Sequence, residues 1–240
     1  MSGWHVVELP LKRRALPRPG QVDLWLTDLE ELPLEAGLNA LTRKERVLKQ
    51  RVQQRFVLRL LLGSYFGVPG KDIVVKRDQF EKPHLGGTLS ETGLRFNLSH
   101  SGHWLAIALT RNRDIGVDIE QQRPMARAAD LASRYFKGPD RARIQQLEEP
   151  ERSVSFLTQW TAREALIKAM GCSLASHLSQ IELDCEPTRI HALPKDWPPD
   201  WQLLKPEWPS SVVGHLAIPN AATERELELN CYWLQTMRRS

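Results

Sequence analysis

Residues 114–120 read Asp-Ile-Gly-Val-Asp-Ile-Glu, and this alternation constrains the fold more than any other stretch of the chain. Its apolar residues recur with a period of two, which predicts a strand with one buried face. Asp118 and Glu120 lie on the other face, where two carboxylates repel each other unless a cation lies between them. Hard oxygen ligands on a rigid strand suit a magnesium site that also holds phosphate. A bare Asp-x-Glu is also common on solvated edge strands, so other segments must decide between these interpretations.

The composition is that of an ordinary globular protein and restricts the function only weakly. Hydrophobic residues make up 41% and charged residues 26% of the 240 residues, enough for one domain or two small ones. The net charge of +4 is compatible with a phosphorylated or acidic partner but does not require nucleic acid. The three cysteines are widely spaced, which favours a reducing compartment. Because no apolar run is long enough for a signal peptide or a membrane span, we expect a cytoplasmic protein.

Hydrophobic periodicity predicts an α+β chain made of two similar lobes, a pseudo-dimer in which each lobe packs a small antiparallel sheet against a long helix. The expected lobes are residues 1–112 and 113–240. The predicted helices cover residues 41–66, 126–136 and 153–170, and the first of them should end at Gly67. The predicted strands cover residues 21–29, 73–76, 94–98, 104–110, 115–120, 212–218 and 226–233.

Two strand pairings are predicted from closeness along the chain. The strand at residues 104–110 should form a hairpin with the strand that carries Asp118 and Glu120. The strands at 212–218 and 226–233 should pair with each other and close the second lobe. Six prolines between residues 187 and 209 predict an irregular surface segment.

A second chemical segment is Trp160-Thr-Ala-Arg-Glu-Ala-Leu-Ile-Lys168. On a helix, Trp160, Glu164 and Lys168 share one face, because they are spaced four residues apart. A Glu and a Lys on an inward-facing stripe need a partner or a cofactor, whereas on an exposed face they would form an ordinary salt bridge. Taken with Asp118 and Glu120, they supply the groups needed for metal-assisted phosphoryl transfer.

A third segment, Phe96-Asn-Leu-Ser-His-Ser-Gly102, predicts a strand that ends in a turn rich in hydroxyl and imidazole groups. Ser99, His100 and Ser101 offer donors for phosphate oxygens. A Ser-His pair is more often a turn or a cap than a catalytic dyad. No third residue at a recognisable spacing supports serine hydrolase chemistry.

These three segments, in this order and separation, resemble the signature motifs of the 4'-phosphopantetheinyl transferases, most closely the monomeric group that activates surfactin synthetase and related carrier-protein systems. A weaker match is Phe80-Glu-Lys-Pro83, where the family usually has a Gly-Lys-Pro turn. The resemblance covers about residues 42–171. It implies magnesium-dependent transfer of the phosphopantetheine arm of coenzyme A to a serine of an apo acyl or peptidyl carrier protein, with release of 3',5'-ADP.

The resemblance also implies roles for individual residues. The expected magnesium ligands are Asp118, Glu120 and Glu164. Glu164 would also accept the serine proton, and Lys168 would steady the α-phosphate or protonate the leaving group. The first lobe would be the coenzyme A-binding side, and the residues expected to grip the phosphates are Lys82, Ser99, His100 and either or both of Arg51 and Arg55.

Two positions depart from the family pattern, and both affect expected contacts. Arg163 stands where the family commonly has lysine, and Glu81 replaces the usual turn glycine before Lys82. The stretch after Glu120 mixes arginines with apolar residues, which would suit docking of the acidic helix of a carrier protein. The alternative is that these apolar residues pack a core of their own.

Other functions stay open at this level. A binding module that senses coenzyme A or an acidic protein would bind saturably with little effect of magnesium. A metal-dependent nuclease would require a more basic surface than the charge of +4 provides. We therefore expect a monomeric transferase with coenzyme A and a carrier protein as partners, and no nucleic acid or membrane. The sequence does not distinguish carriers of fatty-acid, polyketide, nonribosomal-peptide or lysine biosynthesis.

Overall fold

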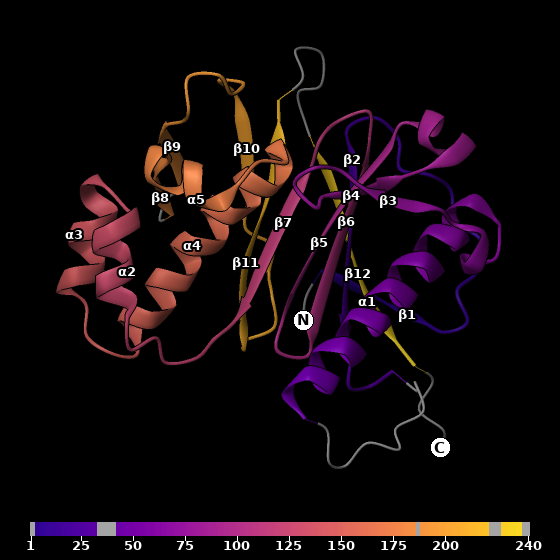
Figure 1. Cartoon of the computed structure of the whole chain (residues 1–240), viewed down its shortest axis with the longest axis horizontal. Coiled ribbons are helices and arrows are strands. Elements are labelled where there is room, and N and C mark those ends of the chain that lie inside the picture. The colour runs from indigo at the N-terminus through magenta and orange to yellow at the C-terminus, as the bar shows by residue number, and fades with distance from the viewer. Residues whose placement is uncertain (1–2, 33–41, 186–187, 221–226, 237–240) are drawn as a thin grey trace.

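The computed structural model describes residues 3–32, 42–185, 188–220 and 227–236, and helix α1 lies over one group of strands while α4 lies over the other (Figure 1). The α-helices are α1 (Arg43–Phe66), α2 (Ala128–Tyr135), α3 (Gly138–Gln146), α4 (Glu151–Met170) and α5 (Leu174–His177). Short 3-10 helices cover Gly70–Asp72, Gly87–Thr92 and Leu178–Gln180. The strands are β1 (Trp4–Glu8), β2 (Gln21–Asp28), β3 (Val75–Arg77), β4 (Pro83–Leu85), β5 (Leu94–Ser101), β6 (Trp104–Arg111), β7 (Gly116–Gln121), β8 (Glu182–Cys185), β9 (Thr188–Ala192), β10 (Trp201–Leu204), β11 (Val212–Pro219) and β12 (Glu228–Gln235).

Helix α1 starts and ends at local sequence signals. The Thr42 side chain accepts a hydrogen bond from the Glu45 amide, and the Glu45 carboxylate accepts one from the Thr42 amide at 2.8 Å. This reciprocal capping satisfies two amides that would otherwise have no partner inside the helix. The helix ends at Gly67, whose φ of 68° is the left-handed conformation that favours glycine. The predicted end of this helix is confirmed.

The larger sheet has five strands in the order β1-β12-β2-β6-β5, and β12 is parallel to both of its neighbours. The predicted pairing of residues 212–218 with 226–233 is therefore wrong. Both edges of β11 are already occupied by β10 and β7, so β12 has no free edge there. In its actual position Tyr232 stacks on Trp25 with ring centroids 4.6 Å apart, and Leu234 is buried.

This insertion places the last described strand in the sheet of the first half of the chain. The chain thus crosses back over the boundary expected at residues 112 and 113. The division into lobes of residues 1–112 and 113–240 stays a prediction, to which the topology adds β12 as an exception. Parallel pairing here also makes the larger sheet mixed, while its β2-β6-β5 part is antiparallel.

The smaller sheet has three antiparallel strands in the order β10-β11-β7. The predicted hairpin between residues 104–110 and the strand of Asp118 is therefore wrong as well. Strand β6 already pairs with β2 on one edge and β5 on the other, so β7 joins a different sheet. The hairpin actually formed is β5–β6, whose two-residue loop is Gly102 and His103.

The apolar face of β7 packs between the two sheets. Ile115, Val117 and Ile119 are at most 1% exposed and contact apolar side chains of β2 and β6, Leu24 and Ala106 among them. The prediction that this strand has one buried apolar face is confirmed. Because that face is fixed in the core, the carboxylate-bearing face must turn toward α4.

The α+β class is confirmed, whereas the pseudo-dimer relation between the lobes stays a prediction. The proline-rich region is more regular than expected, since β9 and β10 lie within it and Trp197 is buried. No helix in the described part of the chain combines the length and the apolar character needed to cross a bilayer.

Candidate active site

The site is built where α4 lies directly on β7, and Gly116 makes this close approach possible. A Cβ atom at Gly116 would lie 1.9 Å from the Ala165 carbonyl oxygen and 2.5 Å from the Ala169 nitrogen. Any larger residue would push the helix away from the strand. The absence of a side chain at this position therefore brings Glu164 and Lys168 of α4 over the carboxylates of β7.

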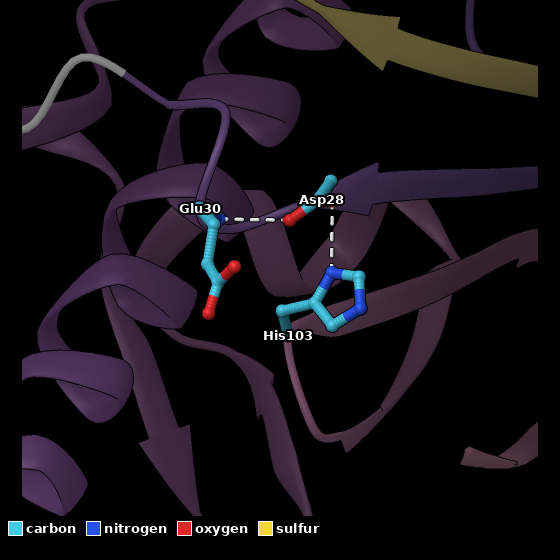
Figure 2. A group of neighbouring side chains, drawn as sticks. All are labelled: Asp28, Glu30 and His103. Atoms are coloured by element: carbon cyan, nitrogen blue, oxygen red, sulfur yellow. Dashed lines mark hydrogen bonds and ion pairs between the residues drawn. The ribbon is translucent and has the colours of Figure 1, made fainter. Parts of the chain in front are cut away.

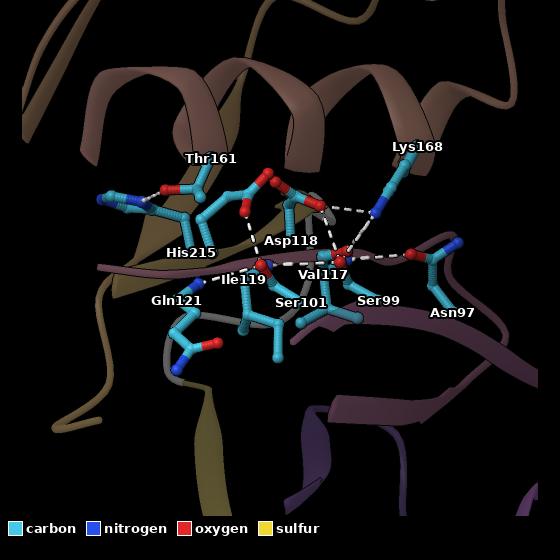
Figure 3. A network of polar contacts seen from close by, with 11 residues as sticks. Asn97, Ser99, Ser101, Val117, Asp118, Ile119, Gln121, Thr161, Lys168 and His215 are labelled. Carbon is cyan, nitrogen blue, oxygen red and sulfur yellow. Dashed lines mark hydrogen bonds and ion pairs between the residues drawn. The ribbon is translucent and has the colours of Figure 1, made fainter. Parts of the chain in front are cut away.

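Asp118 and Lys168 point toward each other across the contact between strand and helix (Figure 3). The Lys168 Nζ lies 2.5 Å from the Asp118 Oδ1, and it also donates to the Ser99 hydroxyl at 3.0 Å and the Val117 carbonyl at 3.3 Å. The Ser99 hydroxyl donates to the same Asp118 oxygen at 2.7 Å. All three protons of the ammonium group are thus directed at protein oxygens.

Glu120 is held at the next outward position of the strand. The Ser101 hydroxyl donates to its carboxylate at 2.5 Å, and the Arg123 guanidinium lies 2.7 Å away. Arg123 is about half exposed, so this second pair is open to solvent. The two carboxylates of β7 therefore each have one hydroxyl donor and one cation as partners.

Glu164 faces the same space from α4, next to Trp160. Burial, followed by the negative charge of Asp118, raises the pKa of Glu164 to about 7, and the charge of Glu120 adds to this effect. A hydrogen bond with Trp160 works in the opposite direction. Burial also raises the pKa of Asp118, although Lys168 opposes it. The carboxylates thus lie close enough to act on each other, and at neutral pH Glu164 has both protonation states available.

The donor set fits a divalent cation chemically. Three carboxylates are hard oxygen ligands, and Lys168 and Arg123 together leave an excess of negative charge. Within the described residues, however, the group of three whose ligand atoms lie within 4.8 Å of one another is a different one: Asp28, Glu30 and His103.

That second group has a structural explanation at the end of β2 (Figure 2). The Asp28 carboxylate lies 2.8 Å from the His103 Nδ1 and accepts a hydrogen bond from the Glu30 amide at 2.8 Å. It ties the end of β2 to the loop between β5 and β6. Asp118 and Glu120 instead engage Lys168 and Arg123, and the role of these two carboxylates and of Glu164 as metal ligands stays a prediction.

Among the residues expected to bind the cofactor, Arg51 lies near enough to His100 for its charge to act on the imidazole. His100 is exposed at the end of β5, and its pKa is lowered by partial burial and then by the charge of Lys168, with a further contribution from Arg51. Arg55 is exposed one turn further along α1. Ser99 is buried and already bonded to Asp118.

Lys82 lies at the other end of the site, on the turn between β3 and β4. Its Nζ donates to the Ala169 carbonyl at 2.7 Å, near the end of α4, and lies 3.5 Å from Asp114. A cavity of about 280 Å³ opens beside it, with Arg95 also in its lining. Glu81 has a φ of 65°, which explains why a glycine would suit this turn position.

Arg163 turns away from the site although it precedes Glu164 in the sequence. Its guanidinium lies 2.5 Å from Asp140 and 4.0 Å from the Phe136 ring, in a fully buried position. The presence of Arg163 in place of the lysine that is common in the family therefore does not alter a contact made inside the site.

Several residues that shape the site were not singled out by the sequence analysis. Arg123 follows the strand with no distinguishing pattern, and His215 comes from a distant strand that faces Asp118 only in the folded protein. Ser101 was expected only as a donor to phosphate oxygens, whereas Asn97 alternates with Phe96 and Leu98 in the sequence. That alternation was a visible signal for side chains turned toward a neighbouring strand.

Comparison with known proteins identifies the family through both halves of the chain. Residues 114–212 match the 4'-phosphopantetheinyl transferase superfamily. Residues 41–112 match the N-terminal region described for 4'-phosphopantetheinyl transferases. The two matches are adjacent and together contain every residue expected to act in the site.

Individual relatives agree with these matches. The 4'-phosphopantetheinyl transferase HetI of Nostoc is 31% identical over 214 residues, which cover 81% of this chain and 89% of that protein. The 4'-phosphopantetheinyl transferase gsp of Aneurinibacillus migulanus is 24% identical, over 55% of this chain and 53% of its own length. The L-aminoadipate-semialdehyde dehydrogenase-phosphopantetheinyl transferase of Xenopus laevis is 29% identical, over 60% of this chain and 51% of its own length.

Proposed function

The chain belongs to the 4'-phosphopantetheinyl transferase superfamily, and we propose that it transfers the 4'-phosphopantetheine arm of coenzyme A to a serine hydroxyl of an apo carrier protein in a magnesium-dependent reaction. The new bond joins the serine oxygen to the phosphorus of the arm. The bond that breaks joins this phosphorus to the oxygen of 3',5'-ADP, which leaves.

The observation that carries this proposal is the arrangement of charges across the contact between β7 and α4. Asp118 and Glu120 on the strand face Glu164 and Lys168 on the helix, as the raised pKa of Glu164 and the contact between Lys168 and Asp118 indicate. A simple binding site for phosphate has no use for three carboxylates. A site that brings a cation to a pyrophosphate does.

Glu164 is our candidate for the base that accepts the proton of the attacking serine. A pKa of about 7 suits this role, because the group can take up a proton near neutral pH without being permanently protonated. Lys168 would hold Asp118 in place and direct positive charge toward the leaving phosphate. Asp118, Glu120 and Glu164 would bind the magnesium ion, which when present would offset the negative charge of the pyrophosphate.

We assign the remaining phosphate contacts to cations around this centre. His100 with Arg51 would meet phosphate groups on the α1 side, and Arg55 can extend that patch. Lys82 and Arg95 line the cavity near the end of α4, which offers space for the nucleotide part of coenzyme A. These cations attract an anionic cofactor from both ends of the carboxylate cluster.

The partner would be an acyl or peptidyl carrier protein domain, met by a monomeric enzyme in the cytoplasm. The arginines after Glu120 would suit the acidic helix of such a carrier. In the structure Leu131 and Phe136 pack in a core cluster with Phe156, so the apolar part of the expected docking surface is reduced.

The test is labelling of an apo carrier protein by coenzyme A, read as a mass increase of the intact carrier. We expect labelling that requires magnesium and is abolished by chelation, by Glu120→Ala and by Glu164→Gln, while circular dichroism stays native. Glu91→Gln, in the exposed 3-10 helix before β5, is the matched control and should label normally. Full activity of either site variant would exclude the metal and base assignments.

A binding module that senses coenzyme A remains the alternative to exclude. It predicts saturable binding of coenzyme A that magnesium barely changes, and no labelled carrier. Measuring binding with and without magnesium, beside the labelling assay, separates the two functions.

A further inference from the structure

Strand β7 is held along its two edges by different kinds of hydrogen bond. On one edge it forms a regular antiparallel backbone ladder with β11. On the other edge lies β5, which belongs to the other sheet and shares no backbone ladder with β7 among the described strands. The amides on that edge are nevertheless bonded, because they donate to side chains of β5 (Figure 3): Val117 to Asn97 at 3.0 Å, Ile119 to Ser99 at 3.3 Å and Gln121 to Ser101 at 3.0 Å.

These three bonds form a regular series, which we call the side-chain ladder of Asn97, Ser99 and Ser101. Each donor lies 20 residues after its acceptor, so the two strands run in the same direction in a fixed register. Every second side chain of β5 meets every second amide of β7, as the period of two requires. A shift by one residue would turn Asn97, Ser99 and Ser101 away from the three amides and bring residues such as Leu98 and His100 to that edge.

Burial makes this ladder necessary. The three side chains are between 4% and 9% exposed, so water has little access to the amides that they satisfy. A buried backbone amide without a partner costs about 1–3 kcal/mol. The position of β7 relative to the larger sheet therefore depends on the identity of three polar residues.

The two serines also contact the carboxylates of the site. Ser99 accepts from the Ile119 amide and from Lys168, and donates its only proton to Asp118. A hydroxyl has one donor and two acceptor positions, so all three positions of Ser99 are in use.

Ser101 makes the equivalent link one step along the strand. It accepts from the Gln121 amide at 3.0 Å and donates to Glu120 at 2.5 Å. Each serine therefore joins a backbone amide to the carboxylate of the residue just before that amide. Such a link fixes the carboxylate relative to its own strand and to β5.

We propose that Asn97, Ser99 and Ser101 are positioning residues, which join the two sheets in place of a backbone ladder and hold Asp118 and Glu120 toward α4. Ser99 then acts on coenzyme A only through Asp118 and Lys168. The role of the carboxylates as magnesium ligands rests on the proposed function, whereas the ladder itself does not.

The test uses Ser101→Ala and Ser101→Thr in the full chain, with Ser90→Ala as a control at an exposed serine. The first readout is amide hydrogen exchange measured by NMR. In Ser101→Ala we expect the Gln121 amide to exchange at least about ten times faster, as an unbonded amide does. The amides of Asp118 and Glu120 point to the β11 edge and should keep their protection, which makes them controls on the same strand.

The second readout is magnesium binding measured by calorimetry in the presence of coenzyme A. We expect Ser101→Ala to weaken binding by about 10–100-fold, the usual effect of removing a group that orients a ligand, and Ser101→Thr to restore it.

Unchanged exchange at Gln121 would overturn the ladder, and faster exchange with unchanged magnesium affinity would overturn the positioning role. If Ser101→Ala does not fold, Ser101→Cys tests the same bonds, because a thiol is a weak acceptor. Wild-type protein that binds no magnesium would contradict the proposed function, and the exchange measurement would still decide the ladder.

Discussion

Two ion pairs on opposite sides of α4 have the same nitrogen–oxygen distance but different surroundings. On the site side, the Lys168 nitrogen lies 2.5 Å from an Asp118 oxygen, and the lysine side chain is 29% exposed. On the other side, the Arg163 nitrogen also lies 2.5 Å from its Asp140 partner, and the arginine side chain is 0% exposed. Solvent therefore reaches the lysine of the first pair. The second is closed to any ligand.

The two pairs also differ in the groups around the cation, which for Lys168 are the Ser99 hydroxyl and the Val117 carbonyl. The Arg163 guanidinium donates to the Gln159 carbonyl at 3.1 Å and lies over the Phe136 ring. A planar guanidinium can stack on a ring in this way, whereas a lysine ammonium is a compact point charge. The comparison teaches that charged neighbours in one helical motif can lie in separate surroundings, one reached by solvent and one closed to it.

The largest effect that tests this contrast is expected at the open pair. Lys168→Met should lower the rate of carrier labelling by about 100- to 10,000-fold, because it removes the cation beside Asp118 and the proposed leaving phosphate. The rate is measured by intact mass at saturating coenzyme A. Lys137→Met, at an exposed lysine, is the control. A Lys168→Met enzyme within threefold of wild type would remove Lys168 from the reaction.

The closed pair should show the reverse behaviour. Arg163→Met should lower the free energy of unfolding by about 3–5 kcal/mol, since it leaves the Asp140 carboxylate buried without its cation. Urea denaturation gives this quantity. The double variant Arg163→Met with Asp140→Leu should recover much of the loss, because both charges are then gone. Labelling activity per folded molecule should stay near wild type, and a specific loss of activity would show that the two sides are not separate.

A third prediction concerns Thr161 of α4, whose hydroxyl lies 2.9 Å from the His215 Nδ1. Burial lowers the pKa of His215 to about 3, well below the value near 6.5 in an unfolded chain. Between these pH values the unfolded chain takes up a proton that the folded protein does not. The contribution of His215 to the free energy of unfolding should therefore fall as pH decreases from about 6.5, by up to about 1.4 kcal/mol per pH unit, whereas Glu164, whose pKa is raised, contributes in the opposite direction.

The check is urea denaturation at pH 7 and pH 5 of wild type and His215→Gln. The variant should be less stable at pH 7 but should show a smaller decrease toward pH 5. His5→Gln, at an exposed histidine, should keep the wild-type dependence. An identical pH dependence in His215→Gln would mean that other groups cause the decrease.

The smallest effect is expected at the turn that carries Lys82 to the end of α4. Glu81→Gly should raise the free energy of unfolding by about 0.5–1 kcal/mol. The left-handed conformation costs a residue with a side chain about 1–2 kcal/mol, and glycine avoids this cost. Part of the gain is lost because glycine has more conformational freedom in the unfolded chain. Thermal unfolding measures it. Glu91→Gly, an exposed position outside such a conformation, should destabilise, and so would Glu81→Gly if the turn were unstrained.

Local patterns predicted which residues form elements and which faces are buried. The period of two correctly buried Val117 and Ile119, and helical spacing correctly put Glu164 and Lys168 on one face toward the carboxylates of β7. Motif spacing also led to the correct family. These properties depend on residues close together in the chain, and so one sequence contains them.

Strand partners and the direction of single side chains were not predictable in this way. The pairing of β12 with β1 joins Trp4 to Cys231, and nothing local marks two strands so far apart as neighbours. Arg163 could not be assigned to the far side of α4 before Asp140 and Phe136 were known to lie there. Ser99 matched a phosphate-binding motif, but the structure engages its hydroxyl fully with protein groups.

The insertion of β12 between β1 and β2 also has a consequence for how the chain is made. A ribosome adds roughly 5–20 residues per second and releases the N-terminal part first. Strands β1 and β2 emerge early, yet neither can complete its pairing until β12 has left the exit tunnel. The first half of the protein must therefore wait with two incomplete strand edges, which are the surfaces most prone to pair with other chains. Chaperone demand during synthesis should accordingly be set by the last strand to appear.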